Sequence, residues 1–289
     1  MLPNLPDFDV DGVIKRALEE DINYIDVTTD LLISSDIRGM ARLVAKDEGV
    51  LSGIDIAVRV FTMLDSSVNC DVLIKDGEFL KTGDVFAEIE GGTASILKAE
   101  RTALNLLQHM SGIATYTRLC VDKVAGTGVS IVDTRKTLPG LRTLQKYAVL
   151  CGGGKNHRFN LSSGVMIKDN HVDVYGSISQ AVAKLRERAG HMVIIEVEVR
   201  DLEQLREAID VGVDVVMLDN MSLNMMKEAV NIVGEGSARP HCTRPKLEAS
   251  GNVTLDNIRK TALTGVDVIS VGALTHSARA LDISLKWGK

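Results

Sequence analysis

Arg135 and Lys136 form a pair of cations directly after a short apolar run. The run, Val129–Asp133, is typical of a buried strand, and Pro139 and Gly140 mark the loop that follows. Arginine grips planar carboxylates with two hydrogen bonds, whereas lysine presents a point charge that suits phosphate. The pair is therefore a candidate anion-binding loop at a strand end, although taken alone it fits an ordinary solvated loop better.

The other predicted strands in the second part of the chain also end in polar or charged residues. Parallel strands place their carboxyl ends at one edge of a sheet, and ligands of α/β folds bind there. Any single end fits a solvated residue, but six in succession indicate a polar cup of mixed charge. The residues at the other five ends are Lys168 and Asp169; Glu196 and Glu198; Asp219 and Asn220; Glu248, Ser250 and Gly251; and Ser270 and Gly272.

The cations of this cup predict an anionic ligand, and its carboxylates predict a cation. Lys168 and the loop Lys155–Arg158 add cationic donors to the first pair, so a carboxylate or phosphate ligand is expected. Glu198 and Asp219 would stand on neighbouring strands. They suit a hard cation such as Mg²⁺, held through water or substrate.

Small residues follow the last two predicted strands, at Ser250–Asn252 and Val271–Ala273. We expect each segment to open a helix, where backbone N–H groups can approach a phosphate closely. The cup is therefore predicted to bind a phosphorylated sugar with a metal, together with a second, carboxylate-bearing molecule.

Alternating strand and helix patterns after Tyr116 must position these residues. A βα repeat predicts a parallel sheet with helices outside. Closure into a TIM-like barrel fits better than a doubly wound sheet, because no Gly-rich dinucleotide turn follows the first strand. Six strands are expected, and a seventh could lie in irregular sequence. The strands are Ser130–Asp133, Gly164–Lys168, Met192–Val199, Val213–Leu218, Pro245–Ala249 and Val266–Val271, and the helices are Ser177–Ala189, Leu202–Val211, Leu223–Val233 and Leu255–Thr264.

The first part of the chain predicts an α+β domain with antiparallel pairing. Arg101 lies on the polar face of a long helical pattern, where a solvated side chain is the simplest explanation. The turns of Lys75–Asp84 are similar to a lipoyl or biotinyl carrier, but the attachment lysine is missing. Helical spacing occurs at Val10–Glu20, Ile54–Leu64 and Ser95–Ile113, strand patterns at Gly39–Ala45, Val68–Ile74 and Asp84–Ile89, a turn at Gly49–Gly53, and a cap or turn at Asp26–Thr29.

Composition narrows the class of protein. The chain has 289 residues, 45% hydrophobic and 25% charged, which is normal for a globular protein, and its net charge of −6 argues against general nucleic-acid binding through a basic surface. A membrane span and a secretory signal are not expected from the hydropathy pattern. The four cysteines, Cys70, Cys120, Cys151 and Cys242, lack metal-ligand spacing, so free thiols and a cytoplasmic location are predicted.

A series of motifs along nearly the whole chain resembles the quinolinate phosphoribosyltransferases, also called nicotinate-nucleotide pyrophosphorylases (carboxylating). The motifs are long and keep their order, so the resemblance is specific. They are Glu100–Asn105, Asp133–Gly140, Gly152–Arg158, Ile167–His171, Glu196–Val199, Leu218–Asn220, Glu248–Gly251 and Val271–Ser277.

The resemblance implies transfer of phosphoribosyl from phosphoribosyl pyrophosphate to quinolinate, with decarboxylation. The products would be nicotinate mononucleotide, pyrophosphate and CO₂, in NAD biosynthesis. It also implies Mg²⁺ with no organic cofactor, and a homodimer, or a higher oligomer, with sites at the subunit interface. The implied fold is an N-terminal α/β sandwich domain of residues 1–112, joined by the tail 275–289, and an incomplete α/β barrel of residues 113–274.

Site residues follow from the same resemblance, position by position. Lys136, Lys168, Glu198 and Asp219 would be catalytic, and Arg101 would act in the partner's site. Lys136, Glu198 and Asp219 would face the ribose, pyrophosphate and Mg²⁺. The quinolinate carboxylates would be held by Arg101, Arg135, His157, Arg158 and Lys168, and the remaining substrate contacts, mainly to the 5′-phosphate, would come from Thr134, Ser250, Gly251, Asn252, Val271, Gly272 and Ala273.

The chain departs from the family pattern at two places, and other functions stay open. Glu20–Asp26 lacks the glycines common in the family, and Ser163 stands where an aspartate is common; neither touches the cup. The role of His157 is open between a substrate contact and a neutral hydrogen-bonding group. Alternatives are a related transferase with another acceptor, which would release no CO₂ from quinolinate, and a non-catalytic phosphosugar-binding protein, which would release no pyrophosphate.

Overall fold

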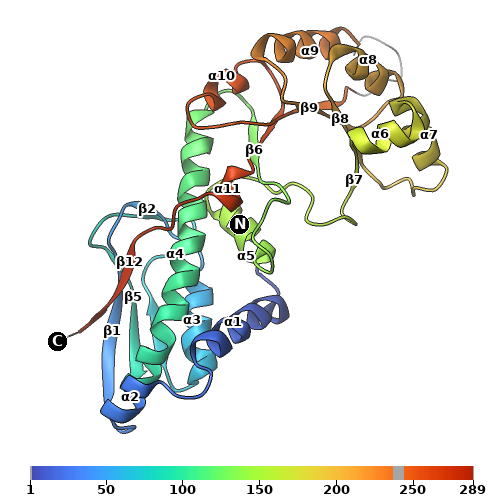
Figure 1. Cartoon of the computed structure of the whole chain (residues 1–289). Helices are drawn as coiled ribbons and strands as arrows, with labels where there is room; N and C mark the ends of the chain where they lie inside the picture. Colours follow the sequence, from blue (N-terminus) through green and yellow to red (C-terminus); the bar gives the residue numbers. More distant parts are fainter. Residues whose placement is uncertain (1, 237–243, 289) are drawn as a thin grey trace. The chain divides into compact units, whose positions relative to one another are not determined.

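The computed structural model describes residues 2–236 and 244–288, so Cys242 lies outside the described residues. The chain forms two compact units (Figure 1). Unit 1 contains residues 1–118, 136–154 and 274–289, and unit 2 contains residues 119–135 and 155–273. The predicted domain boundaries stay a prediction, because a compact group of residues is not by itself a domain that folds alone.

Unit 1 contains the predicted antiparallel sheet. Its strand order is β12-β1-β5-β3, and β2 pairs separately with β4. The last strand, β12, pairs along β1 with Ala41 opposite Trp287. It was not predicted, although its residues Ile283–Trp287 alternate between apolar and polar as a half-buried strand does. The bounds are β1 (Arg38–Ala45), β2 (Gly49–Val50), β3 (Asn69–Val72), β4 (Phe79–Leu80), β5 (Val85–Gly92) and β12 (Ile283–Trp287).

α1, α3 and α4 follow the predicted periodicity, whereas the short helix α2 begins at the predicted cap. α3 has the predicted bounds, and Asp26 caps α2 by accepting from the N–H groups of Thr28 (3.1 Å) and Thr29 (3.0 Å). α4 continues beyond the predicted end at Ile113. Gly112 does not break it but allows a close approach, because a Cβ there would lie 2.1 Å from the carbonyl oxygen of Arg279. The bounds are α1 (Asp7–Asp21), α2 (Val27–Leu32), α3 (Ile54–Leu64), α4 (Thr93–Lys123) and α5 (Arg142–Cys151).

Unit 2 contains the six predicted parallel strands. They are ordered β6-β11-β10-β9-β8-β7, and every neighbouring pair is parallel. With the antiparallel sheet of unit 1, this confirms the predicted fold class. The bounds are β6 (Ser130–Val132), β7 (Val165–Ile167), β8 (Ile195–Val199), β9 (Val215–Asp219), β10 (Lys246–Ser250) and β11 (Val268–Ser270).

Helices connect these strands and lie outside the sheet, as α8 and α9 do beside β8 and β9 (Figure 1). α6 was not predicted, because none of its residues is buried and it therefore lacks an apolar stripe. Each helix in the described residues is too short or too polar to cross a membrane. The bounds are α6 (Asp169–Tyr175), α7 (Ile178–Arg186), α8 (Leu202–Asp210), α9 (Leu223–Gly236) and α10 (Ile258–Ala262); α11 (Ala273–His276) follows β11 and from residue 274 on belongs to unit 1.

Lys155 occupies the place of a seventh strand. It forms a parallel bridge with Val132, its N–H donates to the carbonyl of Ile131 (2.8 Å), and its own carbonyl accepts from the N–H of Asp133 (3.2 Å). A single-residue bridge has no strand periodicity, so only the structure identifies it. This bridge holds the cationic loop after Lys155 along the edge of β6.

The two faces of the unit 2 sheet differ sharply in polarity. One face is aliphatic and fully buried: Val197, Val216, Leu218, Leu247, Ala249 and Ile269 are all 0% exposed. Because side chains alternate along a strand and the register places Glu198 beside Met217 and Met217 beside Glu248, the acidic residues share the other face. We call this the polar face; its members are Glu196, Glu198, Asp219, Glu248, Ser250 and Ser270.

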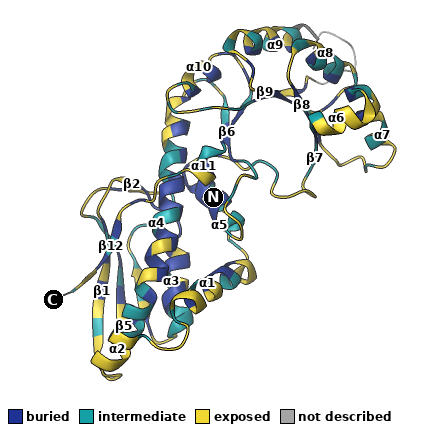
Figure 2. Cartoon of the chain, viewed as in Figure 1, coloured by how far each residue is buried: buried dark blue, intermediate teal, exposed yellow. Residues whose placement is uncertain are grey.

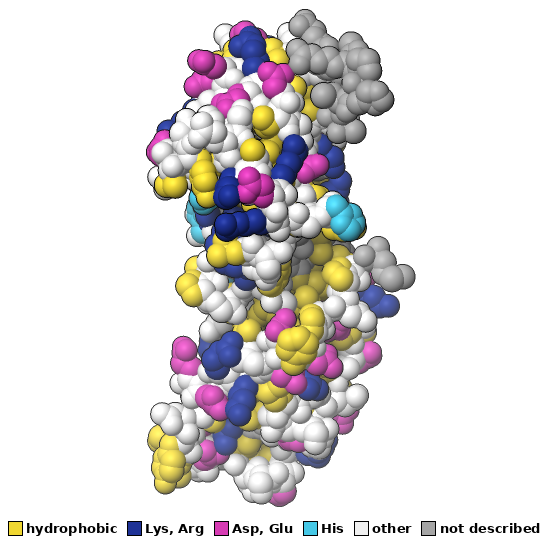
Figure 3. Space-filling view, turned by 90° about the vertical axis from the view of Figure 1, so that its right-hand side faces the viewer, with side chains coloured by type: hydrophobic (Ala, Val, Ile, Leu, Met, Phe, Trp, Pro, Cys, Tyr) yellow, Lys and Arg dark blue, Asp and Glu magenta, His cyan; other side chains and the backbone are white. Residues whose placement is uncertain are grey.

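Surface charges of both signs are interspersed on the face of the molecule shown in Figure 3. This distribution accords with a modest net charge of −6. An anionic ligand therefore has to be bound by a local cluster of cations rather than by a generally positive surface.

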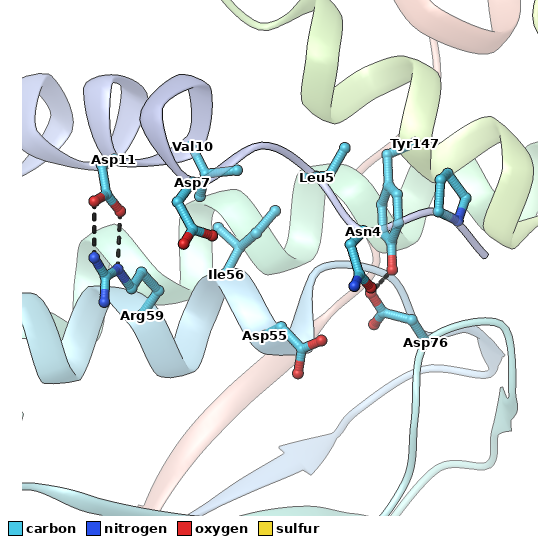
Figure 4. A pocket seen from close by; sticks show the side chains of 11 residues that line it. Asn4, Leu5, Asp7, Val10, Asp11, Asp55, Ile56, Arg59, Asp76 and Tyr147 are labelled. Atoms are coloured by element: carbon cyan, nitrogen blue, oxygen red, sulfur yellow. Dashed lines mark hydrogen bonds and ion pairs between the residues drawn. The ribbon is translucent and has the colours of Figure 1, made fainter.

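Asp76 anchors α3 and α5 to the sheet loops of unit 1. Its carboxylate accepts from the N–H groups of Gly53 (2.9 Å) and Ile54 (3.0 Å), at the first turn of α3, and from the hydroxyl of Tyr147 (2.9 Å). The carboxylate and the Tyr147 ring line a pocket of about 260 Å³ (Figure 4). Burial raises the pKa of Asp76, and its hydrogen bonds oppose that rise.

Replacing Asp76 should destabilise unit 1 more than replacing its tyrosine partner. Asp76→Ala leaves two N–H groups of α3 and one hydroxyl without an acceptor, at about 1–3 kcal/mol per buried group, whereas Tyr147→Phe removes one hydrogen bond worth about 1 kcal/mol. The melting temperature of each variant measures its loss of stability. Asp11→Asn is the control, because its ion pair with Arg59 is exposed (Figure 4) and such pairs contribute little. Equal losses for all three variants would contradict the anchoring role.

Candidate active site

Asp133 fixes the loop that carries His157 and Arg158. It follows β6, is fully buried, and accepts a hydrogen bond from the backbone N–H of His157 (2.9 Å). Together with the Lys155 bridge, this bond holds the loop in register with the strand. The motif of Asp133 and the motif of His157, which are separate in the sequence, therefore form one structural element.

His157 lies against two carboxylates of the polar face. Its Nε2 is 3.1 Å from Oε2 of Glu196 and 3.6 Å from Oε2 of Glu248. Its Nδ1 accepts from the backbone N–H of Arg158 (2.8 Å). Because Nδ1 is an acceptor, the neutral ring carries its hydrogen on Nε2 and donates it toward the carboxylates.

These three side chains also form a set of donors that a metal ion could use. His157, Glu196 and Glu248 each offer one ligand atom, and the three atoms lie within 4.8 Å of one another. A metal would need a lone pair on Nε2, but that nitrogen carries the hydrogen in the observed geometry. The arrangement therefore favours a shared hydrogen over a metal ion at this position.

Glu248 is the more strongly perturbed of the two carboxyls. It is 3% exposed. Burial, followed by the negative charge of Glu196, raises its pKa from 4.5 to about 7, with His157 acting in the opposite direction. Two buried carboxylates that face one imidazole do not both ionise readily, so a proton is retained at Glu248 up to near-neutral pH.

The guanidinium of Arg158 lies within reach of the positive charge of Arg135. Burial and the positive charge of Arg135 lower the pKa of Arg158, while Glu196 raises it. The Arg158 guanidinium also donates to the carbonyl of Gly164 (3.1 Å). Two neighbouring guanidiniums repel each other, and an anion that contacts both would relieve that repulsion.

Lys168 and Glu198 form an ion pair at the ends of β7 and β8. Lys168 Nζ lies 2.9 Å from Oε2 of Glu198, and the lysine is half exposed while the glutamate is mostly buried. The next residue, Asp169, pairs with Arg200. The predicted cation and carboxylate of these strand ends are thus brought into direct contact.

The loop after β10 differs from its prediction. Ser250–Asn252 does not open a helix, because Gly251 (φ 98°) and Asn252 (φ 50°) have left-handed backbone conformations and α10 begins only at Ile258. The segment after β11 does lead into a helix, since α11 begins at Ala273, but that helix has only four residues. A phosphate site built on two helix N-termini is therefore wrong for the first loop.

The structure brings most of the predicted site residues into unit 2. Arg101, exposed on α4, and Lys136, exposed after β6, belong to unit 1 instead. All of these assignments stay predictions. The unit 2 members are Thr134, Arg135, His157, Arg158, Lys168, Glu198, Asp219, Ser250, Gly251, Asn252, Val271, Gly272 and Ala273.

Sequence reasoning missed the grouping of His157 with Glu196 and Glu248. The sequence indicates part of this grouping, because Glu196 and Glu248 are charged residues inside otherwise apolar strand patterns. Their meeting depends on the strand order, in which β9 separates β8 from β10. Strand order cannot be derived from periodicity.

Comparison with known proteins shows similarity over almost the whole chain. Residues 26–111 match the family model of the quinolinate phosphoribosyl transferase N-terminal domain, and residues 113–286 match that of the C-terminal domain. A probable nicotinate-nucleotide pyrophosphorylase [carboxylating] of Bacillus subtilis is 46% identical over 264 residues, covering 90% of this chain and 89% of its own. That of Methanocaldococcus jannaschii is 42% identical, with 94% and 95% covered. The crystal structure of NadC from Streptococcus pyogenes superimposes with a TM-score of 0.92 at 40% identity, covering 99% of this chain and 100% of that one.

Glu248→Gln should change how the stability of the chain depends on pH. A carboxyl whose pKa is about 7 in the folded chain and 4.5 when unperturbed stabilises the fold fully below the lower value, and that contribution is lost as pH rises to the higher one. Glutamine does not ionise, so the variant should gain stability relative to the wild type over this interval. Melting temperature against pH measures the effect, with the exposed Glu228→Gln as control. Parallel curves for the wild type and Glu248→Gln would contradict the raised pKa.

Proposed function

The chain belongs to the quinolinate phosphoribosyltransferase family, and we propose how its residues perform that family's reaction. The reaction transfers phosphoribosyl from phosphoribosyl pyrophosphate to quinolinate and releases pyrophosphate and CO₂, which yields nicotinate mononucleotide for NAD biosynthesis.

Arg135, Arg158 and Lys168 bind the two carboxylates of quinolinate. The observation that carries this proposal is that the charge of Arg135 acts on the guanidinium of Arg158, where it adds to the larger effect of burial in lowering the pKa of Arg158. Guanidiniums hold carboxylates in bidentate fashion, and a dianion compensates both charges. Lys168 adds a third cation, which can exchange its contact with Glu198 for one with the substrate.

Glu198 and Asp219 face the ribose and pyrophosphate, with Lys136 as the cation for the leaving group. The ends of β8 and β9 supply two carboxylates on one sheet face, and such oxygens suit a hard cation held with the substrate phosphates. Mg²⁺ bound there would supply positive charge against the negative charge that develops on the leaving pyrophosphate. The same carboxylates would stabilise positive charge on the sugar.

Backbone groups at the ends of β10 and β11 bind the 5′-phosphate. Small residues let the N–H groups of Ser250–Asn252 and Val271–Ala273 approach it, and Thr134 lies on the same edge of the sheet after β6. This assignment rests on loop N–H groups rather than on a helix terminus for Ser250–Asn252.

No general base is needed for the proposed chemistry. The quinolinate nitrogen attacks C1 of the ribose as pyrophosphate leaves. When CO₂ departs, the positively charged ring stabilises the electron pair left on the adjacent carbon, and a proton from solvent then bonds to that carbon. His157 already has partners on both ring nitrogens. We therefore infer that it positions Arg158 and the carboxylates rather than moving a proton.

We further propose that the chain acts as a homodimer in which Arg101 completes the partner's site. Exposed apolar side chains around α2 support an association surface: Tyr24 is 94%, Leu31 78% and Leu32 74% exposed (Figure 2). Such patches are characteristic of interfaces. Free thiols at Cys70, Cys120 and Cys151 accord with the proposed cytoplasmic location.

Quinolinate should be used and nicotinate should not. Nicotinate lacks the carboxylate at position 2, so it would leave cations at the site without their anion, and sites built for a polar group reject analogues that lack it by about 10⁴–10⁵-fold. Formation of nicotinate mononucleotide from each acid gives the ratio of kcat/KM values. Comparable kcat/KM values would refute the dicarboxylate site.

Mixing two inactive variants should restore activity if Arg101 acts in the partner's site. Arg101→Ala and Lys136→Ala should each be nearly inactive. After subunit exchange, about one quarter of the sites should be complete, because half of the dimers are hybrids with one intact site each.

The matched control mixes Lys136→Ala with Lys168→Ala. Both residues are proposed to act within one subunit's own site, so every hybrid site lacks one of them and no recovery is expected. If the mixture of Arg101→Ala with Lys136→Ala also shows no recovered activity although mass spectrometry shows exchanged subunits, Arg101 does not act across the interface.

A further inference from the structure

Two asparagines have left-handed backbone conformations at the ends of adjacent strands. Asn220 follows β9 with φ 52°, and Asn252 follows β10 by two residues with φ 50°; among the described residues they are the only non-glycine positions with positive φ. Asparagine tolerates this conformation better than most residues. Their occurrence side by side, next to Asp219 and the Ser250 loop, indicates a local function.

The side chains of these residues form a chain of hydrogen bonds that ends on Asp219. Asn252 Nδ2 donates to Oδ1 of Asn220 (3.1 Å), and Asn220 Nδ2 donates to Oδ2 of Asp219 (3.1 Å). A carboxylate only accepts, so the amide nitrogen of Asn220 must face Asp219 and its oxygen must face Asn252. The order of the groups thus fixes the orientation of each amide.

Gly251 allows the amide of Asn220 to lie against the loop. A Cβ at Gly251 would be 2.1 Å from Oδ1 and 2.6 Å from Cγ of Asn220. The backbone N–H of Asn220 also donates to the carbonyl of Ser250 (3.0 Å). Asn220 is therefore packed between Asp219 and the loop 250–252, and it contacts both.

The loop is in turn tied to the start of α10. Asn257 Nδ2 donates to the carbonyl of Asn252 (2.9 Å), and Asn257 Oδ1 accepts from the N–H of Thr254 (2.8 Å). The backbone around Asn252 is thus held from one side by Asn257. From this anchored backbone, the side chain of Asn252 reaches the amide of Asn220, which in turn donates to Asp219.

We propose that Asn220 and Asn252 are positioning residues that couple the loop 250–252 to the carboxylate of Asp219. The proposal rests on the proposed function, in which that loop binds the 5′-phosphate and Asp219 faces the ribose of the same substrate. A phosphate seated on the loop then sets the orientation of Asp219 through the two amides. If the backbone conformation alone mattered, glycine would serve at either position at least as well.

The test compares Asn220→Gly, Asn220→Asp and Asn252→Gly in the full-length enzyme. Asn220→Gly keeps the backbone conformation and removes the amide, so KM for phosphoribosyl pyrophosphate should rise about 10- to 100-fold, as expected for a lost hydrogen bond to a charged group. Asn220→Asp should be at least as impaired, because a second carboxylate cannot donate to Asp219 and repels it. The dissociation constant of quinolinate, measured by calorimetry on the enzyme alone, should stay unchanged. An Asn220→Gly enzyme with normal KM overturns the proposal.

The double variant tests the coupling itself. Since both asparagines act through one chain of hydrogen bonds, Asn220→Gly combined with Asn252→Gly should be little worse than Asn220→Gly alone. If the KM of the double variant rises by the product of the two single-variant increases, the two asparagines act independently and the coupling is overturned. Asn231→Ala, an exposed asparagine on α9, is the control for substitution, and melting temperatures confirm that each variant is folded.

Asp219→Asn separates this inference from the proposed function beneath it. If Asp219→Asn leaves the use of phosphoribosyl pyrophosphate intact, the role of Asp219 is wrong and the inference fails with it. If Asp219→Asn is impaired while Asn220→Gly is normal, only the coupling is overturned. Impairment of both, with quinolinate binding retained, supports the proposal.

Discussion

The burial of charged groups on one face of a parallel sheet is the constraint on which the rest of unit 2 depends. An isolated buried carboxylate is too costly to retain, yet Glu196 and Glu248 are 6% and 3% exposed. Three features make them tolerable: the hydrogen on Nε2 of His157, the raised pKa of Glu248, and the positive charge of Arg158 nearby. The opposite, aliphatic face supplies the packing that holds the strands in place.

This constraint links the local structure to the chemistry. Asp133 and the Lys155 bridge hold the loop that presents His157, and Arg158 follows His157 directly. The cations therefore stand on a rigid edge rather than on a free loop, as a site for a planar dianion requires. At the neighbouring strand ends, Asp219 and the loop 250–252 are joined through Asn220.

Much of this arrangement could be predicted from the sequence, and the remainder depends on long-range contacts. The six barrel strands and α3 follow from apolar periodicity, and the strand-end position of Lys168 and Glu198 follows from the strands. The trio of His157, Glu196 and Glu248 depends on the strand order, which periodicity does not contain. The Lys155 bridge and the left-handed Asn220 have no repeating pattern from which to predict them, whereas the alternation of β12 was present and overlooked.

The central claim is that one polar cup carries out both phosphoribosyl transfer and decarboxylation. The ratio of released pyrophosphate to released CO₂ tests this claim most directly. Quinolinate labelled in its 2-carboxylate would be turned over with phosphoribosyl pyrophosphate, and labelled CO₂ and pyrophosphate would be measured in the same reaction. We expect equal amounts of both at every time point, and no CO₂ without the phosphoribosyl donor. Release of pyrophosphate without CO₂, or of CO₂ without the donor, would contradict the account.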